Sequence, residues 1–190
     1  MDKGATRKTA LLVIDAQAGI IQGPFDGPVY QAEQLLHTIR GLLDHARSHK
    51  LPVFFVQDVD LLQGGEEAFA IPPEIAPLPG EPVIHKQATD SFHGTTLHEQ
   101  LQAQEINHLV IAGCKTQFCI DSACRKATTL GYDVTLVKDG HSTTDSKVLT
   151  AEQIIAHHNT CLHGLGNLEP FILVRSSSES VFEPIHDTYR

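Results

Sequence analysis

Short apolar runs alternate with longer segments of helical periodicity along this chain, and this alternation constrains the fold more than any other feature. The runs are rich in β-branched and aromatic residues, as buried strands are. They occupy residues 10–15, 52–57, 82–85, 108–112, 133–137 and 171–174. Because parallel strands need a long crossover between them, usually a helix, the pattern is typical of a parallel sheet covered by helices. The sequence therefore predicts an α/β fold with six strands.

The segments between the runs carry helical stripes. Between residues 32 and 46, apolar side chains recur at three- and four-residue intervals, so one face of that helix should pack on the sheet. A second helix over residues 118–130 should end at Gly131 and bury Cys124 in the core. The last long helix is expected to begin near Asp145 or Ser146. Its apolar side would carry Val148, Ala151, Ile155, Leu162 and Leu165, with His158 as a hydrogen-bonded histidine among them.

Length and charge narrow the class of protein. A chain of 190 residues with 41% hydrophobic residues can bury one sizeable core, and no linker or repeat divides it, so residues 1–190 are expected to form a single domain. The net charge of −9 disfavours nucleic acid and anionic membranes as partners. No spanning apolar run or signal-like leader is visible, so a cytoplasmic location with four free thiols is expected. Segment 60–81, rich in Pro and Gly, is predicted to be a packed cover.

Three potentially reactive residues fall at or just beyond predicted strand ends. Asp15 closes the first strand, Lys86 follows the third, and Cys119 comes shortly after the fourth. Ligands of open parallel sheets bind beyond the carboxyl ends of the strands, so the fold should bring these three side chains to one edge. Taken singly, each has an ordinary alternative, because such an Asp is most often a turn residue and such a Lys a solvated charge.

The three residue types together suit a thiol hydrolase. A cysteine in the first helical turn after the plausible cap Thr116 would feel the positive end of the helix dipole, and a nearby ammonium would add to this. Both effects are expected to favour the thiolate. A carboxylate within reach could take the thiol proton and return it to a leaving group, which is acyl transfer by nucleophilic and acid–base catalysis.

The segment over residues 110–144 resembles the nucleophile segment of the isochorismatase-like cysteine hydrolases. It has a strand, the pattern G-x-x-T-x-x-C, a helix with small residues, L-G-Y and a strand that ends in Asp. The run Asp15-Ala16-Gln17 and the stretch 81–97 are similar to the family's Asp and Lys motifs, in the right order. The resemblance implies a three-layer α/β/α sandwich with a six-stranded parallel sheet, and a catalytic triad of Cys119, Asp15 and Lys86.

The same resemblance implies further features of the site. A cis peptide would join Cys114 and Lys115, and the backbone N–H groups of Lys115 and Cys119 would face the oxyanion. Nicotinamidase-like members bind a metal through an Asp-x-His motif, whereas the matching place here reads Asp58-Val59-Asp60. No metal and no cofactor are therefore expected. Members are commonly dimers or tetramers, so a homo-oligomer is expected.

The resemblance also bears on the reaction, because members of the family that cleave a vinyl ether can lack the cysteine, so that Cys119 here implies hydrolysis of a small-molecule amide C–N bond. The pocket walls are expected to include side chains beside the motifs, namely Gln17, Phe25, Phe92 and Phe118. The turn Asp139-Gly140-His141 is expected to be a capped turn rather than part of the site. Three alternatives stay open at this point: an ether hydrolase, a catalytically silent binding or assembly module, and a thiol redox protein, which would need a resolving cysteine beside Cys119.

Overall fold

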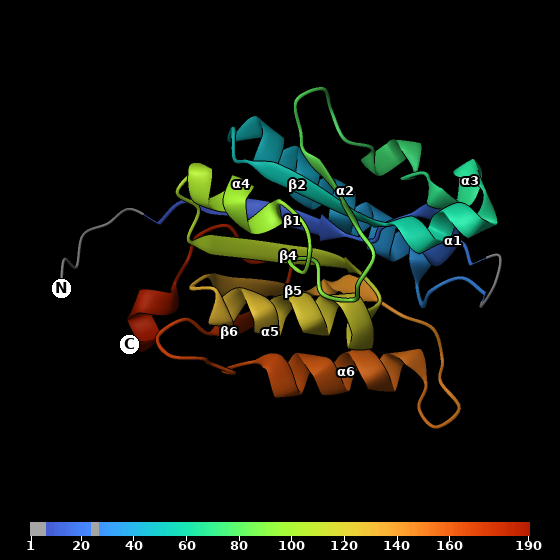
Figure 1. Ribbon diagram of the computed structural model, residues 1–190. Coiled ribbons are helices and arrows are strands. Elements are labelled where there is room, and N and C mark those ends of the chain that lie inside the picture. Colours follow the sequence, from blue (N-terminus) through green and yellow to red (C-terminus); the bar gives the residue numbers. More distant parts are fainter. Residues whose placement is uncertain (1–6, 24–26) are drawn as a thin grey trace.

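A six-stranded sheet organises the structure, a computed structural model that describes residues 7–23 and 27–190. The strand order is β3-β2-β1-β4-β5-β6, and all neighbouring strands are parallel (Figure 1). The strands are β1 (Thr9–Ile14), β2 (Val53–Asp58), β3 (Val83–Lys86), β4 (His108–Cys114), β5 (Asp133–Ser142) and β6 (Ile172–Arg175). The chain order reverses between β1 and β4, which is where such sheets bind their ligands.

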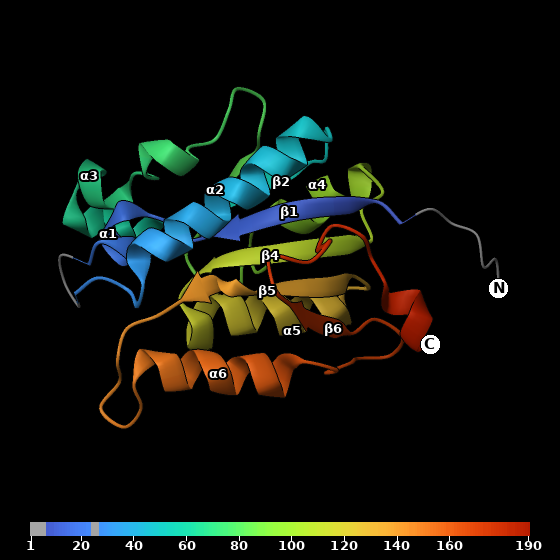
Figure 2. The ribbon, with the colours of Figure 1, turned by 180° about the vertical axis from the view of Figure 1, so that it is seen from behind.

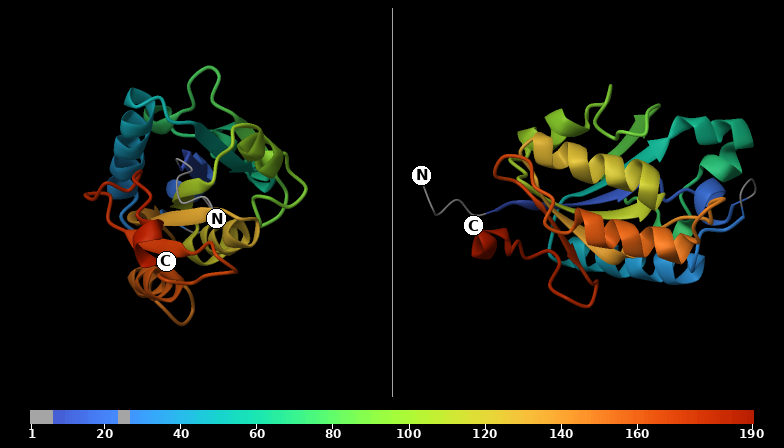
Figure 3. Two further views of the ribbon diagram at one scale, coloured as in Figure 1. Left: turned by 90° about the vertical axis from the view of Figure 1, so that its left-hand side faces the viewer. Right: turned by 90° about the horizontal axis from the view of Figure 1, so that it is seen from below.

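Helices cover both faces of the sheet, and the predicted α/β/α sandwich is confirmed. Helix α2 (Ala32–Ser48) packs on one face, and in Figure 2 it lies in front of the sheet. Helices α4 (Leu97–Ala103) and α5 (Asp121–Thr129) pack on the other face. Helix α6 (Ala151–Leu162) lies beside α5 and β6, and Figure 3 shows the layers end-on. Shorter turns complete the chain: α1 (Ala18–Ile21), η1 (Val59–Gly64), α3 (Glu66–Phe69), η2 (Pro73–Ile75), η3 (Thr116–Ile120) and η4 (His186–Tyr189).

The two covered faces explain why the strands are apolar throughout. Successive side chains of a strand point to opposite faces. In β1, Leu11 and Val13 therefore pack in the core under α2, whereas Leu12 and Ile14 pack in the core under α4 and α5. All four are at most 1% exposed, and burial of each such side chain stabilises the fold by roughly 1.5–3 kcal/mol.

The predicted elements agree with the structure at most boundaries. Strand ends differ from the predicted ones by at most two residues, except that β5 continues to Ser142. Helix α5 is followed by Gly131 with φ +97°, and Cys124 is fully buried, both as predicted. All four cysteines are unpaired thiols.

The predicted start of the last helix was wrong. Thr150 caps α6, with its hydroxyl accepting from the Gln153 backbone N–H while the Gln153 side chain accepts from the Thr150 N–H. This capping box fixes the start of the helix. Ser146 instead forms a local turn with Leu149, and Val148 is 86% exposed in that loop. On the helix itself, Ile154 is buried and Ile155 is half-buried.

Segment 60–81 packs on the body of the protein, which confirms the predicted cover. Ile75 is fully buried in the core under α2, and the Phe69 ring packs edge-on against His85. None of the helices in the described part of the chain has the length and apolar character needed to cross a membrane.

Candidate active site

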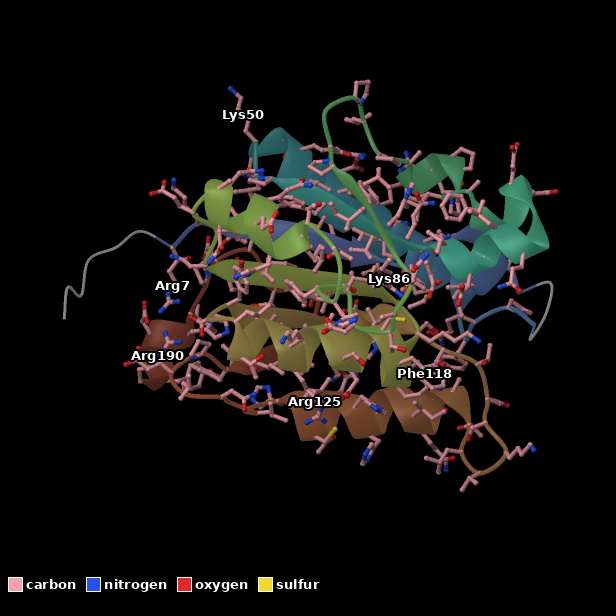
Figure 4. All side chains as sticks on the ribbon, in the orientation of Figure 1. Arg7, Lys50, Lys86, Phe118, Arg125 and Arg190 are labelled. Atoms are coloured by element: carbon pink, nitrogen blue, oxygen red, sulfur yellow. The ribbon has the colours of Figure 1, made fainter. Side chains whose placement is uncertain are left out.

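Four chemically active side chains meet at the carboxyl ends of the four strands β3, β2, β1 and β4. Asp15 follows β1, Asp58 ends β2, Lys86 ends β3 and Cys119 lies in the π-helical turn η3 after β4. The Lys86 Nζ atom lies 2.9 Å from Asp15 Oδ2, 3.0 Å from Asp58 Oδ2 and 3.4 Å from Cys119 Sγ. Figure 4 shows Lys86 at this end of the sheet. The three N–H donors of the ammonium thus face three acceptors.

Lys86 is charged although its side chain is completely buried. Burial alone would lower its pKa, but the negative charge of Asp15 and the contacts with Cys119 and Asp58 outweigh burial and raise the pKa above its usual value. A buried lysine is stable only when it is paired, and this one is paired twice.

Asp15 is held in an unusual environment. Its backbone has φ +49°, a left-handed conformation that is strained for a residue other than glycine. Burial raises the pKa of its carboxyl group to about 6, although Lys86 opposes this rise. The Lys86 ammonium at 2.9 Å and the Cys119 side chain both act on the carboxylate and lower its pKa, but burial has the larger effect. Asp15 is therefore ionised at neutral pH and is a stronger base than an ordinary aspartate.

The Cys119 thiol is protonated at neutral pH, and the expectation of a favoured thiolate was wrong. Burial, followed by the nearby Asp15 charge, raises its pKa to about 12, and Lys86 lowers it too little to compensate. Asp15 and Asp58 already place two negative charges around one ammonium, so a thiolate would add a third. Cys119 also lies ahead of α5, in the preceding π-helical turn.

The segment that leads into η3, the turn that carries Cys119, has specific backbone requirements. Gly113 has φ +128°, and a Cβ atom there would lie 1.9 Å from the Ile14 carbonyl oxygen, so no other residue fits. The Cys114–Lys115 peptide bond is cis, at the position that the resemblance implies. The predicted capping role of Thr116 was wrong, because its hydroxyl contacts His141 in β5 instead.

A cavity of about 370 Å³ opens onto Asp15, Asp58 and Cys119. Ile20, Leu61 and Phe118 form its apolar wall, and Phe118 remains 53% exposed (Figure 4). Leu61 comes from the covering segment 60–81. The cavity can therefore take a small, partly apolar molecule next to the thiol.

The other expected wall residues are placed differently. Phe92 is buried in the core and stacks on Tyr132. Gln17 is fully buried; its amide nitrogen donates to the carbonyl oxygens of Phe69 and Asp58, and its amide oxygen accepts from the Asp58 N–H. Gln17 thus ties the end of β1 to the end of β2. Phe25 lies outside the described residues.

Asp58 is the site residue that the sequence argument missed. It was considered only as the counterpart of a metal-binding motif. The rule that found Asp15 and Lys86 applies to it as well, because it ends the strand between theirs in the sheet order. Asp15, Asp58 and Cys119 could offer ligand atoms within 4.8 Å of one another. The Lys86 ammonium contacts all three, so it supplies the positive charge that a metal would bring.

Comparison with known proteins places this chain in a family. The isochorismatase domain matches residues 9–155. The isochorismatase family protein YddQ of Bacillus subtilis is 30% identical over 167 residues, which are 83% of this chain and 92% of YddQ. The ureidoacrylate amidohydrolase RutB of Caulobacter segnis is 26% identical over 173 residues, 70% of this chain and 72% of RutB.

The fold agrees with these sequence relationships. The crystal structure of an isochorismatase from Pseudomonas putida superposes with a TM-score of 0.80 at 27% identity, and covers 93% of each chain. The chain therefore belongs to the isochorismatase family of hydrolases.

Proposed function

We propose that this chain hydrolyses an amide C–N bond of a small molecule, with Cys119 as nucleophile and Asp15 as its base. The observation that carries this proposal is the contact of one fully buried ammonium, that of Lys86, with both Asp15 and Cys119. The similarity to the ureidoacrylate amidohydrolase RutB supports the amide class. Like that of a general base in other enzymes, the Asp15 pKa of about 6 lies near neutral pH.

The first half of the reaction forms a thioester. Cys119 Sγ attacks the carbonyl carbon while its proton passes to the Asp15 carboxylate, and the carbonyl oxygen becomes an oxyanion that the N–H groups of Lys115 and Cys119 hold. Asp15 then returns the proton to the leaving nitrogen as the C–N bond breaks. The acyl group stays on Cys119, and ammonia or an amine departs.

The second half regenerates the enzyme. Asp15 takes a proton from water as the water oxygen attacks the thioester, and the proton returns to the sulfur when the C–S bond breaks. In both halves negative charge moves between Asp15 and its neighbours. Lys86 touches both the carboxylate and the sulfur, so it compensates the charge at each stage without moving far.

The test is a screen of small amides and carbamoyl compounds with the wild type, Cys119→Ala and Cys161→Ala in parallel. Cys161 is exposed on α6 and serves as the matched control. We expect Cys119→Ala to abolish amine release and Cys161→Ala to retain it, with an acyl adduct on Cys119 in the mass spectrum of rapidly quenched wild type. Undiminished turnover by Cys119→Ala would refute the assignment of the nucleophile.

A further inference from the structure

The end of β5 departs from regular pairing with β4. The two strands pair regularly up to Ile111 and Leu136, and the next pairs are Gly113 with His141 and Cys114 with Ser142. Residues 137–140 thus form a bulge that shifts the register. The position of Gly140 requires glycine, because a Cβ atom there would lie 2.8 Å from the Val137 side chain. The bulge brings His141 beside the strand end that leads to Cys119.

Two hydrogen bonds from Ser177 stabilise the outer side of the bulge. The Asp139 carboxylate accepts hydrogen bonds from the Ser177 backbone N–H at 2.8 Å and from the Ser177 hydroxyl at 2.5 Å. The turn Asp139-Gly140-His141 is therefore more than the capped turn that was expected. Asp139 points outward to Ser177, whereas the His141 side chain is 3% exposed and points inward.

A directed chain of hydrogen bonds runs from α6 through His141 to the nucleophile turn. The Asn159 amide nitrogen donates to the Lys138 carbonyl oxygen at 3.1 Å, which fixes the orientation of the amide. The Asn159 oxygen then faces His141 Nε2 at 3.0 Å, so Nε2 carries the proton. His141 Nδ1 is consequently an acceptor, and the fully buried Thr116 hydroxyl donates to it at 2.9 Å.

Thr116 is the first residue of η3, the turn that carries Cys119. At a helix start a threonine hydroxyl usually accepts from a backbone N–H. Here the cap position is Lys115 and has no side-chain cap, while the Thr116 hydroxyl is committed to β5. The start of η3 is thus held by the hydrogen bond between Thr116 and His141 in β5, and not by a side-chain cap within the turn.

We propose that Asn159, His141 and Thr116 form a positioning relay that fixes the nucleophile turn in its reactive orientation. The inference rests on the proposed role of Cys119. His141 acts through Thr116 as a positioning residue, since both of its ring nitrogens are occupied by these partners. Misplacement of a reacting group by about 1 Å can cost on the order of a hundredfold in rate, so such a relay has a measurable effect.

The relay works with a neutral imidazole. Burial lowers the pKa of His141 to about 4 against the opposing hydrogen bond with Asn159, and the titratable groups that act on it are His158 on α6 and Asp139 in the bulge. His141 therefore stays neutral at the pH where Asp15 is ionised. It holds the turn and transfers no proton.

The experiment compares Thr116→Val, which removes the hydroxyl at nearly constant shape, with Thr116→Ser, which keeps it. Both are made in a Cys161→Ser background, and the second-order rate of Cys119 alkylation by iodoacetamide is measured with mass-spectrometric assignment. We expect Thr116→Val to slow alkylation about tenfold or more and Thr116→Ser to stay near the parent rate. In Thr116→Val, a further His141→Asn substitution should have little additional effect, because the two residues act as one unit.

Thermal unfolding of each variant identifies the folded proteins that enter the comparison. If His141→Asn fails to fold, the Thr116 pair alone decides. A folded Thr116→Val that alkylates at the parent rate would overturn the relay, as would equal slowing by Thr116→Ser. Alkylation needs no substrate, so this result is independent of the amide screen. Turnover by Cys119→Ala would refute the proposed function instead, whatever the alkylation rates.

Discussion

Two buried aspartates at opposite ends of the sheet have very different partners. Asp15 lies at the carboxyl end of β1, where Lys86 is its ion-pair partner at 2.9 Å and the Cys119 side chain also acts on it. Asp133 opens β5 at the other end. One of its oxygens accepts from Arg7, and the other accepts from Arg190 at 2.5 Å and from the Phe171 N–H at 3.3 Å. Figure 4 shows Arg7 and Arg190 at the left end of the molecule and Lys86 to the right of its centre.

The difference shows what pairing does to a buried carboxylate. Asp133 has donors on both oxygens and joins Arg7, just ahead of β1, to Arg190, so its role is to stabilise the fold. Asp187 bridges the same two arginines, whose hydrogen bonds lower its pKa to about 2. Asp15 is fully buried and has Lys86 as its ion-pair partner, and burial outweighs this contact and keeps its pKa raised, at about 6. A carboxylate whose burial outweighs its pairing retains the basicity that proton transfer needs.

The largest effect is expected for Asp15→Asn. Loss of the base should lower kcat/KM for an identified amide substrate by about 10²–10⁴-fold. The folded state raises the Asp15 pKa from 3.8 to about 6. The stability that this shift provides is fully present below pH 3.8 and is lost as the pH rises through 6, a difference of roughly 3 kcal/mol.

Urea unfolding at pH 7.5 should therefore show Asp15→Asn to be as stable as the wild type or more stable. Retained activity would contradict the assignment of Asp15 as the base. A large loss of stability would contradict the view that its ionised form is unfavourable in the fold.

The next largest effect is expected for Asp133→Asn. This substitution should lower the stability of the fold and leave the reactivity of Cys119 unchanged. Loss of the buried Asp133 carboxylate leaves Arg7 and Arg190 with Asp187 as their carboxylate partner, and the free energy of unfolding should fall by about 1–3 kcal/mol. Cys119 alkylation in the folded protein should stay near the wild-type rate, because Asp133 opens β5 and Cys119 follows the far end of β4. Asp187→Asn is the matched control. Asp187 is 64% exposed, so its loss should cost about 1 kcal/mol or less.

The comparison also explains what the sequence could predict. Asp15, Lys86 and Cys119 follow from strand ends and chain order, since a parallel sheet brings the carboxyl ends of its strands to one edge. The Asp133 cluster does not follow, because it joins Arg7, Arg190 and Asp187 through contacts that leave no periodic signal. The protonation of the thiol also depends on a total charge that includes Asp58, which was not placed at the site.

Competition between local and tertiary hydrogen-bond partners explains the other differences between the predicted and the observed structure. Thr116, Asp145 and Ser146 all look like helix caps, because their side chains can accept from a backbone N–H. The Thr116 hydroxyl bonds to His141 in β5, and Ser146 forms a turn ahead of α6, whereas Asp145 does accept from the Ala151 N–H at the start of α6. The choice among such partners is made by tertiary contacts. The register shift in β5 is of the same kind, since residues 137–140 leave the regular pairing with β4.

The smallest effect is expected for Asp58→Asn, and it tests whether the charge of Asp58 contributes to the pKa of Asp15. Activity of the wild type should fall below about pH 6, because Asp15 must be ionised to accept the thiol proton. The Asp58 charge raises the pKa of Asp15, and Asp58 also shares the Lys86 ammonium with it at 3.0 Å. Removing the charge lowers the Asp15 pKa on both counts, so the acid limb of the kcat/KM profile should move to lower pH by less than about one unit.

Asp60→Asn is the matched control for this shift, because Asp60 is exposed two residues further along the chain. Its pH profile should coincide with that of the wild type. Alkylation of Cys119 as a function of pH gives the same comparison without a substrate. An acid limb that stays in place or moves upward in Asp58→Asn would mean that Asp58 does not set the basicity of Asp15, and that the balance of burial and the Lys86 ion pair alone distinguishes it from Asp133.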